Sequence, residues 1–315
     1  MNLYALQRFN TALDGQKDAV FYQARQEARE LRREQFVEAA ADTFPGIESI
    51  CPDWERLFRY LAEQGVIVVL GEFPYLIEQD ESLPSVLQAL FDNEFAESET
   101  TFVVVGSSIS MMEEATLLGD SPLYGRTSLT LDIRELSFDA VTEFLPDRTT
   151  ADDAVRAWSV FGGVPYYPEE LDADRSLGEN IQRTVLTHHG SLGNEPEHVL
   201  RMELREPTRY FSILEAIAGG ATGRNEIAGV TGIDYNQLST YLDRLSRLRL
   251  IERHVPVTES AERSKRSQYR LRDPLFRFWF RFLYGSTDRY DHFGENAYER
   301  LVEPGLADFV APAFE

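Results

Sequence analysis

The sequence predicts an α/β domain built on a parallel sheet, then a smaller domain of three helices and a β-hairpin, then a helical C-terminal segment. Two β-branched runs, Val66–Leu70 and Thr101–Val105, flank an amphipathic helix. Such runs are typical of strands buried on both faces of a parallel sheet, and a strand-helix-strand order favours parallel pairing. The second half instead contains short amphipathic stretches separated by glycine-containing turns.

The elements of the first domain follow from local periodicity. Apolar residues at three- and four-residue spacing predict helices, and β-branched runs predict strands. Ser82 and Pro84 provide an N-cap and a first-turn proline for the helix that follows them. The predicted strands are 19–22, 66–70, 101–105 and 129–133, and the predicted helices are 26–44, 54–64, 83–91 and 151–161.

The second half predicts three helices followed by a hairpin. The helices are 209–218, 224–230 and 236–248, and the hairpin strands lie within 250–257 and 268–271. This is the element order of a winged helix-turn-helix. The aromatic run 276–284 is interpreted as a buried helix rather than a base-stacking platform. The expected domains are therefore 1–170 (α/β), 171–204 (helical connector), 205–272 (winged helix-turn-helix) and 273–315 (helical).

The charge is unevenly distributed. The chain has 315 residues with 31 Lys plus Arg against 53 Asp plus Glu, a net charge of −22, and its only lysines are Lys17 and Lys265. From Arg205 to Arg281, however, 14 cationic and nine acidic side chains give +5, which leaves −27 for the rest. A basic island in an acidic chain indicates a local site for a polyanion. The acidic excess with little lysine also resembles proteins of salt-accumulating halophiles.

Several classes of protein are excluded. No apolar run approaches the ~18 residues of a membrane span, so no membrane partner is expected. A single cysteine and histidines without ligand spacing predict no metal site made of Cys and His.

The segment 66–76, VIVVLGEFPYL, is a buried strand that ends in an acidic residue. This is the form of a Walker B element, in which the carboxyl edge of a sheet presents a carboxylate to Mg²⁺ and the attacking water. Glu72 is the candidate carboxylate. The alternative is a solvated carboxylate at a strand end.

At Glu72-Phe73-Pro74-Tyr75-Leu76 the chain resembles archaeal AAA-type ATPases with a DUF234-like C-terminal region. Further similar blocks follow in the family's order at 105–108, 121–126, 161–166 and 273–279. The resemblance implies a cytoplasmic protein with a P-loop-NTPase-like fold that uses ATP and Mg²⁺. Gly71 stands where the family has its metal-coordinating Asp.

The resemblance also implies roles for individual residues. Glu72 would act as general base or position the water, Ser107 and Ser108 would contact the γ-phosphate, and Arg126 would be a sensor or arginine finger. The alternatives are that the serines cap the next helix and that Arg126 forms a surface ion pair.

A phosphate-binding loop of the form GxxxxGK[ST] is missing from the sequence. Lys17 lies in Asp14-Gly15-Gln16-Lys17-Asp18, which lacks the glycine spacing and the hydroxyl residue. By resemblance the chain is expected to begin after the P-loop and to end before a nuclease-like part. The family implies an ATPase, whereas the missing loop and Gly71 argue that hydrolysis is lost, and the sequence leaves both open.

The basic island contains the candidate nucleic-acid contacts. Leu238, Leu242, Leu245 and Leu248 form the apolar stripe of helix 236–248 and leave a polar face outward. That face carries Asn236, Gln237, Thr240, Arg244 and Arg247, which are residue types that bind base edges or phosphates. Arg263, Lys265 and Arg266 at the hairpin turn would contact phosphates. The expected partner is double-stranded DNA. The alternative is a non-enzymatic regulatory module that binds DNA or another protein.

Overall fold

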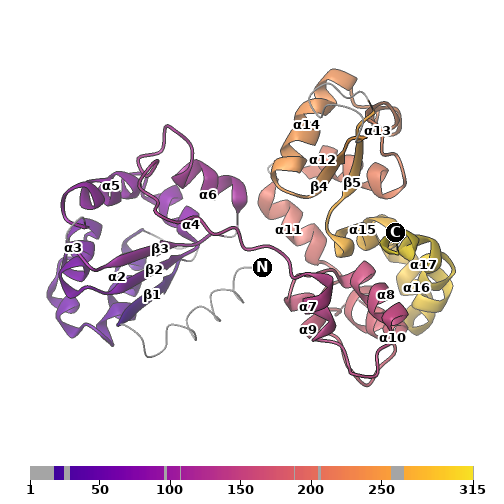
Figure 1. Ribbon diagram of the computed structural model, residues 1–315, viewed down its shortest axis with the longest axis horizontal. Helices are drawn as coiled ribbons and strands as arrows, with labels where there is room; N and C mark the ends of the chain where they lie inside the picture. The colour runs from indigo at the N-terminus through magenta and orange to yellow at the C-terminus, as the bar shows by residue number, and fades with distance from the viewer. Residues whose placement is uncertain are drawn as a thin grey trace. The chain divides into compact units, whose positions relative to one another are not determined.

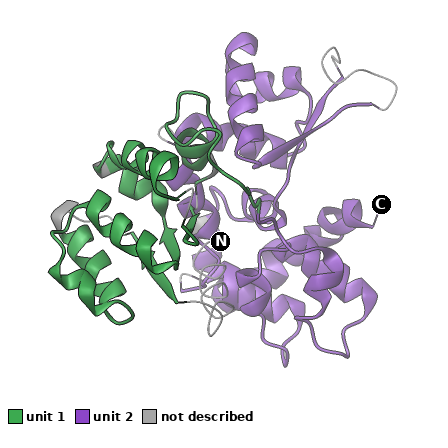
Figure 2. Cartoon of the chain, turned by 60° about the vertical axis from the view of Figure 1, so that its left-hand side comes forward, with its two compact units in different colours: residues 1–132 green, residues 133–315 purple. Residues whose placement is uncertain are grey.

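The computed structural model describes residues 18–24, 29–95, 98–106, 108–187, 189–204, 207–256 and 266–314. The chain divides into two compact units, Met1–Asp132 and Ile133–Glu315 (Figure 2). The sequence predicts that the first domain ends at residue 170. In the structure, residues 133–170 belong to the second compact unit.

Unit 1 contains a parallel three-stranded sheet with the strand order β1-β2-β3 (Figure 1). The strands are β1 (Ala19–Gln23), β2 (Ile67–Gly71) and β3 (Thr101–Val104), which confirms three of the four predicted strands. β2 is central among them and is buried from Val68 onward, which explains its uninterrupted apolar sequence. β3 lies at the edge of the sheet and is only partly buried.

Helices flank this sheet in Figure 1. Their bounds are α2 (Arg29–Ala41), η1 (Pro45–Ser49), α3 (Trp54–Gln64), α4 (Phe73–Gln79), α5 (Leu83–Asn93) and α6 (Ile109–Thr116). The helix predicted for 54–64 is confirmed: Asp53 accepts from the N–H groups of its first turn, and Gly65 ends it with φ 66°. Phe36 packs edge-on against Trp54 and Phe58, which stack on each other with ring centroids 5.3 Å apart.

The predicted strand at 129–133 is wrong. This segment has no regular secondary structure. Its apolar side chains Leu129, Leu131 and Ile133 are 69%, 71% and 55% exposed. A strand needs a hydrogen-bonded neighbour as well as alternating residues, and no described strand pairs with this segment.

Unit 2 has two apolar cores. The unit begins with the helices α7 (Phe138–Thr142), α8 (Ala151–Phe161), α9 (Tyr166–Glu169) and α10 (Leu177–Ile181) and the π-helical turn η3 (Gln182–Leu186). The unit ends with α15 (Pro274–Phe282), α16 (Thr287–Phe293), η4 (Gly294–Asn296), η5 (Tyr298–Val302), α17 (Glu303–Val310) and η6 (Ala311–Ala313). Residues of both sets, such as Phe161, Ile181 and Leu306, share one core.

The second core lies between α11 (Glu195–Glu203), α12 (Pro207–Ala218), α13 (Arg224–Thr231) and α14 (Tyr235–Arg247) and the antiparallel strands β4 (Ile251–His254) and β5 (Gln268–Leu271). Three helices followed by an antiparallel pair is the element order expected from the sequence. An isolated bridge between Gly223 and Gln268 ties the start of α13 to this pair.

Helix α15 contributes to both cores. Leu275 and Phe278 enter the first core, while Phe276, Trp279 and Phe280 enter the second. Trp279 also donates its indole N–H to the carbonyl of Gly193 at 2.8 Å. The prediction that the aromatic run forms a buried helix is therefore confirmed.

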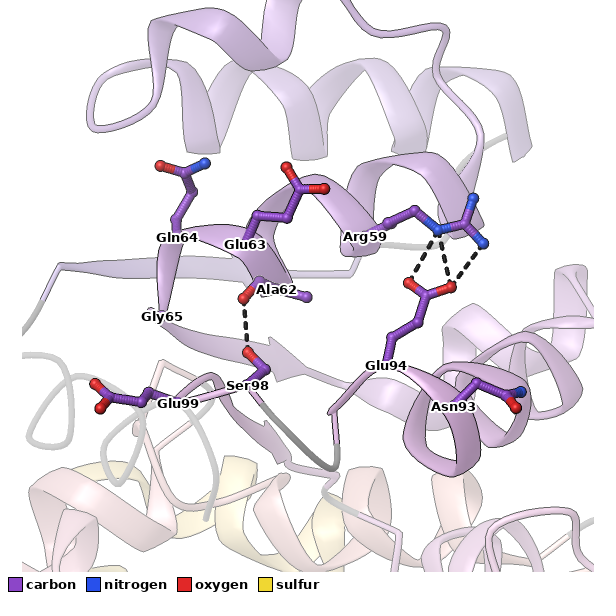
Figure 3. A pocket seen from close by; sticks show the side chains of 9 residues that line it. All are labelled: Arg59, Ala62, Glu63, Gln64, Gly65, Asn93, Glu94, Ser98 and Glu99. Carbon is purple, nitrogen blue, oxygen red and sulfur yellow. Dashed lines mark hydrogen bonds and ion pairs between the residues drawn. The ribbon is translucent and has the colours of Figure 1, made fainter.

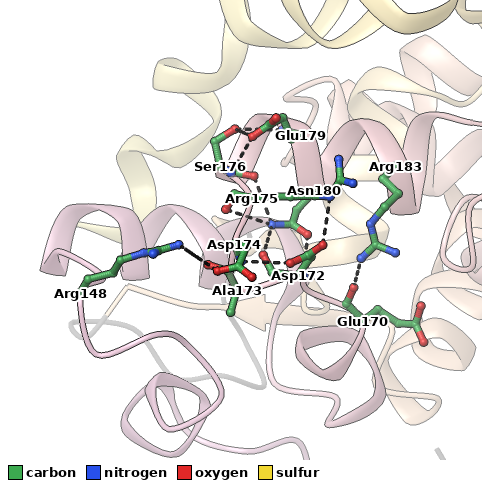
Figure 4. Close-up of polar contacts among 10 residues, drawn as sticks. All are labelled: Arg148, Glu170, Asp172, Ala173, Asp174, Arg175, Ser176, Glu179, Asn180 and Arg183. Atoms are coloured by element: carbon green, nitrogen blue, oxygen red, sulfur yellow. Dashed lines mark hydrogen bonds and ion pairs between the residues drawn. The ribbon is translucent and has the colours of Figure 1, made fainter.

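A polar loop links α9 to α10 and is organised by one buried side chain, Asn180 (Figure 4). Its Oδ1 accepts from the N–H of Asp172 at 2.8 Å, and its Nδ2 donates to the carbonyls of Asp172 and Ser176 at 3.0 and 3.1 Å. Ser176 and Glu179 form a reciprocal capping box at the start of α10. The loop is thus held by side chains that replace regular backbone pairing.

In the described part of the chain, no helix is long and apolar enough to cross a membrane.

Candidate functional site

The carboxyl edge of the unit 1 sheet positions Glu72. Glu72 follows β2 directly and adopts the left-handed conformation with φ 53°. The adjacent strand ends are tied together, because the N–H of Phe73 donates to the carbonyl of Val105 at 2.9 Å and the N–H of Val105 donates to Leu70 at 2.9 Å. The left-handed conformation costs an ordinary residue roughly 1–2 kcal/mol, and such outliers cluster at functional sites.

A glycine allows the neighbouring strand end to approach this turn closely. A Cβ atom at Gly106 would lie 2.5 Å from Sδ of Met112 and 2.8 Å from Cδ of Pro74, which is too close for any side chain. The backbone after β3 therefore packs directly on the first turn of α4. The tied and close-packed strand ends place the segment that carries Ser108 beside the turn that carries Glu72.

The structure gives Ser108 a capping position. Ser108 is the N-cap of α6, and its Oγ accepts from the N–H of Met111 at 3.4 Å. This is the alternative interpretation of the sequence; a phosphate contact by Ser108 stays a prediction. Ser107 lies outside the described residues.

Arg126 forms an ion pair within unit 1. Its Nε and Nη2 donate to the two carboxylate oxygens of Asp92 at 2.8 and 2.7 Å, and its Nη1 donates to the carbonyl of Pro122 at 3.0 Å. The hydrogen bond from Arg126 lowers the pKa of the Asp92 carboxyl below its usual value. The surface ion pair considered as the alternative is therefore present, and Arg126 would have to leave Asp92 to reach a phosphate.

These groups alone do not form a phosphate cradle for ATP. Among the described residues, no cluster of three or more Asp, Glu, His or Cys side chains could hold a metal ion by protein ligands alone, whereas Mg²⁺ bound with a nucleotide needs only one or two carboxylates. Gly71, where a metal-coordinating Asp would stand, is buried in the sheet and pairs with Gln23. Of the residues predicted to touch nucleotide, Arg126 is bound to Asp92 and Ser108 caps a helix. A phosphate cradle would have to come from groups outside this set.

A shallow depression in unit 1 lies away from this edge (Figure 3). It is lined by residues at the end of α3 and α5 and just before β3, at the amino-terminal side of the sheet. Glu94 occupies it by accepting from Nε of Arg59 at 2.9 Å, and Arg59 also pairs with Glu55 at 2.8 Å. Its lining arginine is thus already bound to carboxylates, and the depression is separate from the turn that carries Glu72.

The second candidate surface is the outward face of α14. Leu238, Leu242 and Leu245 are fully buried, as the predicted apolar stripe requires. Asn236, Gln237, Thr240 and Arg247 are exposed and Arg244 is half-buried, so the structure brings these five predicted residues onto one helix and toward solvent. Among described residues, no carboxylate pairs with Arg247.

The hairpin turn is only partly described. Arg266 is exposed just before β5, and Arg263 and Lys265 lie outside the described residues. On the hairpin, Nε of Arg253 donates to Oγ of Ser267 at 2.8 Å. The predicted phosphate contacts at the turn therefore stay predictions.

Sequence reasoning missed three features of this surface. Val230 and Tyr235 are 68% and 45% exposed at the two sides of the turn between α13 and α14. The guanidinium of Arg224 lies 5.4 Å from the centroid of the Tyr235 ring. Asp243 is exposed on α14 three residues after Thr240, so an acidic group interrupts the polar face. Helical spacing from the buried leucines would have revealed Asp243; the exposure of Val230 depends on tertiary packing.

Comparisons with known proteins support the first unit's relationship to ATPases. Residues 4–171 match a family described as an ATPase domain predominantly from Archaea. The chain is 33% identical over 249 residues to the uncharacterized protein MJECL04 of Methanocaldococcus jannaschii, a match that covers 79% of this chain and 55% of that protein. The chain thus spans about half the length of this curated relative.

A solved structure, the Walker-type ATPase PABY2304 of Pyrococcus abyssi, has a similar fold. The TM-score is 0.61 with 17% identity, and the match covers 84% of each chain. At this identity the likeness establishes the fold alone. The family match ends at 171, close to the domain end predicted at 170, although the helices after residue 132 pack in unit 2. The match covers more than half of the 315 residues, and the chain belongs to the family of ATPase domains found predominantly in Archaea.

Proposed function

We propose that this chain is an AAA-type ATPase-like protein that binds double-stranded DNA through a winged helix and has lost ATP hydrolysis. DNA binding is proposed because α14 exposes a polar and basic face to solvent while its leucine stripe on the opposite side is fully buried. The order α12-α13-α14-β4-β5 and the Gly223–Gln268 bridge support a winged helix-turn-helix, in which the third helix enters the major groove.

Charge supports a polyanion as partner. The segment from Arg205 to Arg281 carries a net +5 in a chain of −22. Phosphate contacts by arginine release condensed counterions, so affinity for DNA would fall steeply with salt. The halophile-like composition makes high KCl a relevant buffer, and the measurement should therefore span a range of KCl concentrations.

The loss of hydrolysis is proposed from the residues at the sheet edge. Family membership makes ATP and Mg²⁺ plausible ligands, but the sequence lacks a GxxxxGK[ST] loop and has Gly71 before Glu72. Titration of the protein with ATP and Mg²⁺ in high KCl should give no tight binding. Micromolar affinity, or hydrolysis above background, would contradict this part of the proposal.

DNA binding is tested with paired arginine variants. Arg244→Ala with Arg247→Ala should weaken binding to a fluorescent duplex and reduce the slope of log affinity against log salt by about 2. The matched control is Arg148→Ala with Arg156→Ala, two exposed arginines outside the α12–β5 segment. Equal affinity of both double variants would refute the DNA contact and favour a protein partner for this surface.

A further inference from the structure

Two amide side chains lie at the amino end of α14. Asn236 and Gln237 are its second and third residues, and both are exposed. Asp234 caps the helix, with its Oδ1 accepting from the N–H of Asn236 at 2.9 Å. The cap orders the first turn, so both amides project from a fixed backbone.

An apolar surface adjoins this end of the helix. Tyr235, the first residue of α14, is 45% exposed, and Val230 on the other side of the turn is 68% exposed. Arg224 restrains the tyrosine, because its guanidinium lies 5.4 Å from the Tyr235 ring centroid and its Nη2 donates to the hydroxyl of Tyr269 at 3.4 Å. A Cβ atom at Gly232, within the turn, would meet nothing within 4 Å, so the space beside the turn is open.

The two ends of α14 differ in charge. At the amino end the Asp234 carboxylate and the Arg224 guanidinium beside Tyr235 offset each other, so this end carries no net positive charge to attract phosphate. Arg244 and Arg247 lie in the last turn. Asn236 and Arg247 are about 16 Å apart along the helix axis at the standard rise. The amino end is therefore suited to base edges and the carboxyl end to phosphates.

We propose that the amino end of α14 selects A·T base pairs in the major groove of duplex DNA, an inference that rests on the proposed function. Asparagine and glutamine pair with adenine: the amide oxygen accepts from adenine N6–H and the amide nitrogen donates to adenine N7. The thymine of the same pair exposes a C5 methyl group, which packs against the ring of Tyr235, with Val230 extending the apolar surface. At 3.6 residues per turn, Asn236 lies about 100° around the helix from Tyr235 and Gln237 about 200° from it, so Asn236 is the amide that would share a base pair with Tyr235, and Gln237 would contact a neighbouring pair.

The test begins with a pool of randomised duplex DNA, from which bound molecules are selected by the full chain in high KCl. The enriched core is then resynthesised with uracil in place of thymine, or with 7-deazaadenine in place of adenine. Loss of the methyl group should weaken binding about threefold to fourfold, the effect of one buried methylene. Loss of N7 should weaken it at least as much.

Protein variants identify the residues. Asn236→Ala with Gln237→Ala should reduce the preference for the enriched core by ~5- to 100-fold and leave the salt dependence unchanged. Tyr235→Ala should abolish the difference between thymine and uracil duplexes. The matched control is Gln64→Ala with Asn93→Ala, two exposed amides of unit 1, which should behave as the parent protein.

The outcomes separate the two proposals. Salt-dependent duplex binding with no A·T enrichment would overturn the A·T inference and leave DNA binding intact. An A·T preference that survives the Asn236/Gln237 double variant would likewise overturn it. Failure of every duplex to bind at any salt concentration would overturn the DNA-binding function itself.

Discussion

The backbone at Glu72 provides a direct test of the strand-end geometry. Glu72 has φ 53° and links β2 to α4. The left-handed conformation costs a residue with a Cβ atom roughly 1–2 kcal/mol, whereas glycine adopts it freely. At a position with negative φ, glycine would instead be less stable than alanine by about 0.5–1 kcal/mol.

Comparing the stability of Glu72→Gly with that of Glu72→Ala isolates the free-energy cost of the left-handed conformation for a residue with a Cβ atom. Both variants remove the carboxylate and its contacts, and they differ only in the Cβ atom. Glu72→Gly should be more stable than Glu72→Ala by about 1 kcal/mol, after subtraction of glycine's greater freedom in the unfolded chain. In a thermal melt this corresponds to a Tm higher by roughly 2–4 °C, measured by circular dichroism.

The sign of the Tm difference between Glu72→Gly and Glu72→Ala shows whether residue 72 has a left-handed backbone. A glycine variant that melts at the same temperature as the alanine variant, or below it, would show that residue 72 has an ordinary backbone in solution. The strand end would then hold its carboxylate without backbone strain. Glu94→Gly and Glu94→Ala, at the end of α5 where φ is −117°, form a control pair in which alanine should be the more stable.

Three further outcomes are expected. Burial raises the pKa of Asp273 to about 6, so its folded-state pKa exceeds the unfolded value and stability should fall as pH rises from about 4 to 6. Asp273→Asn, which keeps an N-cap acceptor, should remove about 1–3 kcal/mol of this pH dependence in urea unfolding between pH 4 and 7. Asn180→Ala should destabilise the folded chain by about 2–3 kcal/mol through lost loop hydrogen bonds, and an unchanged urea midpoint would contradict that role. Asp243→Asn should raise duplex affinity about threefold by removing a carboxylate from the α14 face, and unaltered anisotropy titrations would place Asp243 away from DNA.

The sequence by itself determined the elements whose signals are local. The β-branched runs predicted β2 and β3, and helical spacing of apolar residues predicted α3 and α8 with the observed bounds. The leucine spacing of α14 correctly separated its buried stripe from its exposed face, because helical geometry fixes which side chains share a side. The Glu72-Phe73-Pro74 motif correctly indicated an ATPase-related family.

Tertiary structure alone decided the features that depend on distant residues. The alternation at 129–133 could not reveal whether a neighbouring strand was present to pair with it, and none of the described strands does. The partner of Arg126 is Asp92, which is remote in sequence, and residues of α8 and α9 share a core with residues of α15 and α17. Periodicity records which side of an element is apolar, but not what covers it, because packing brings together residues whose separation along the chain carries no local signal.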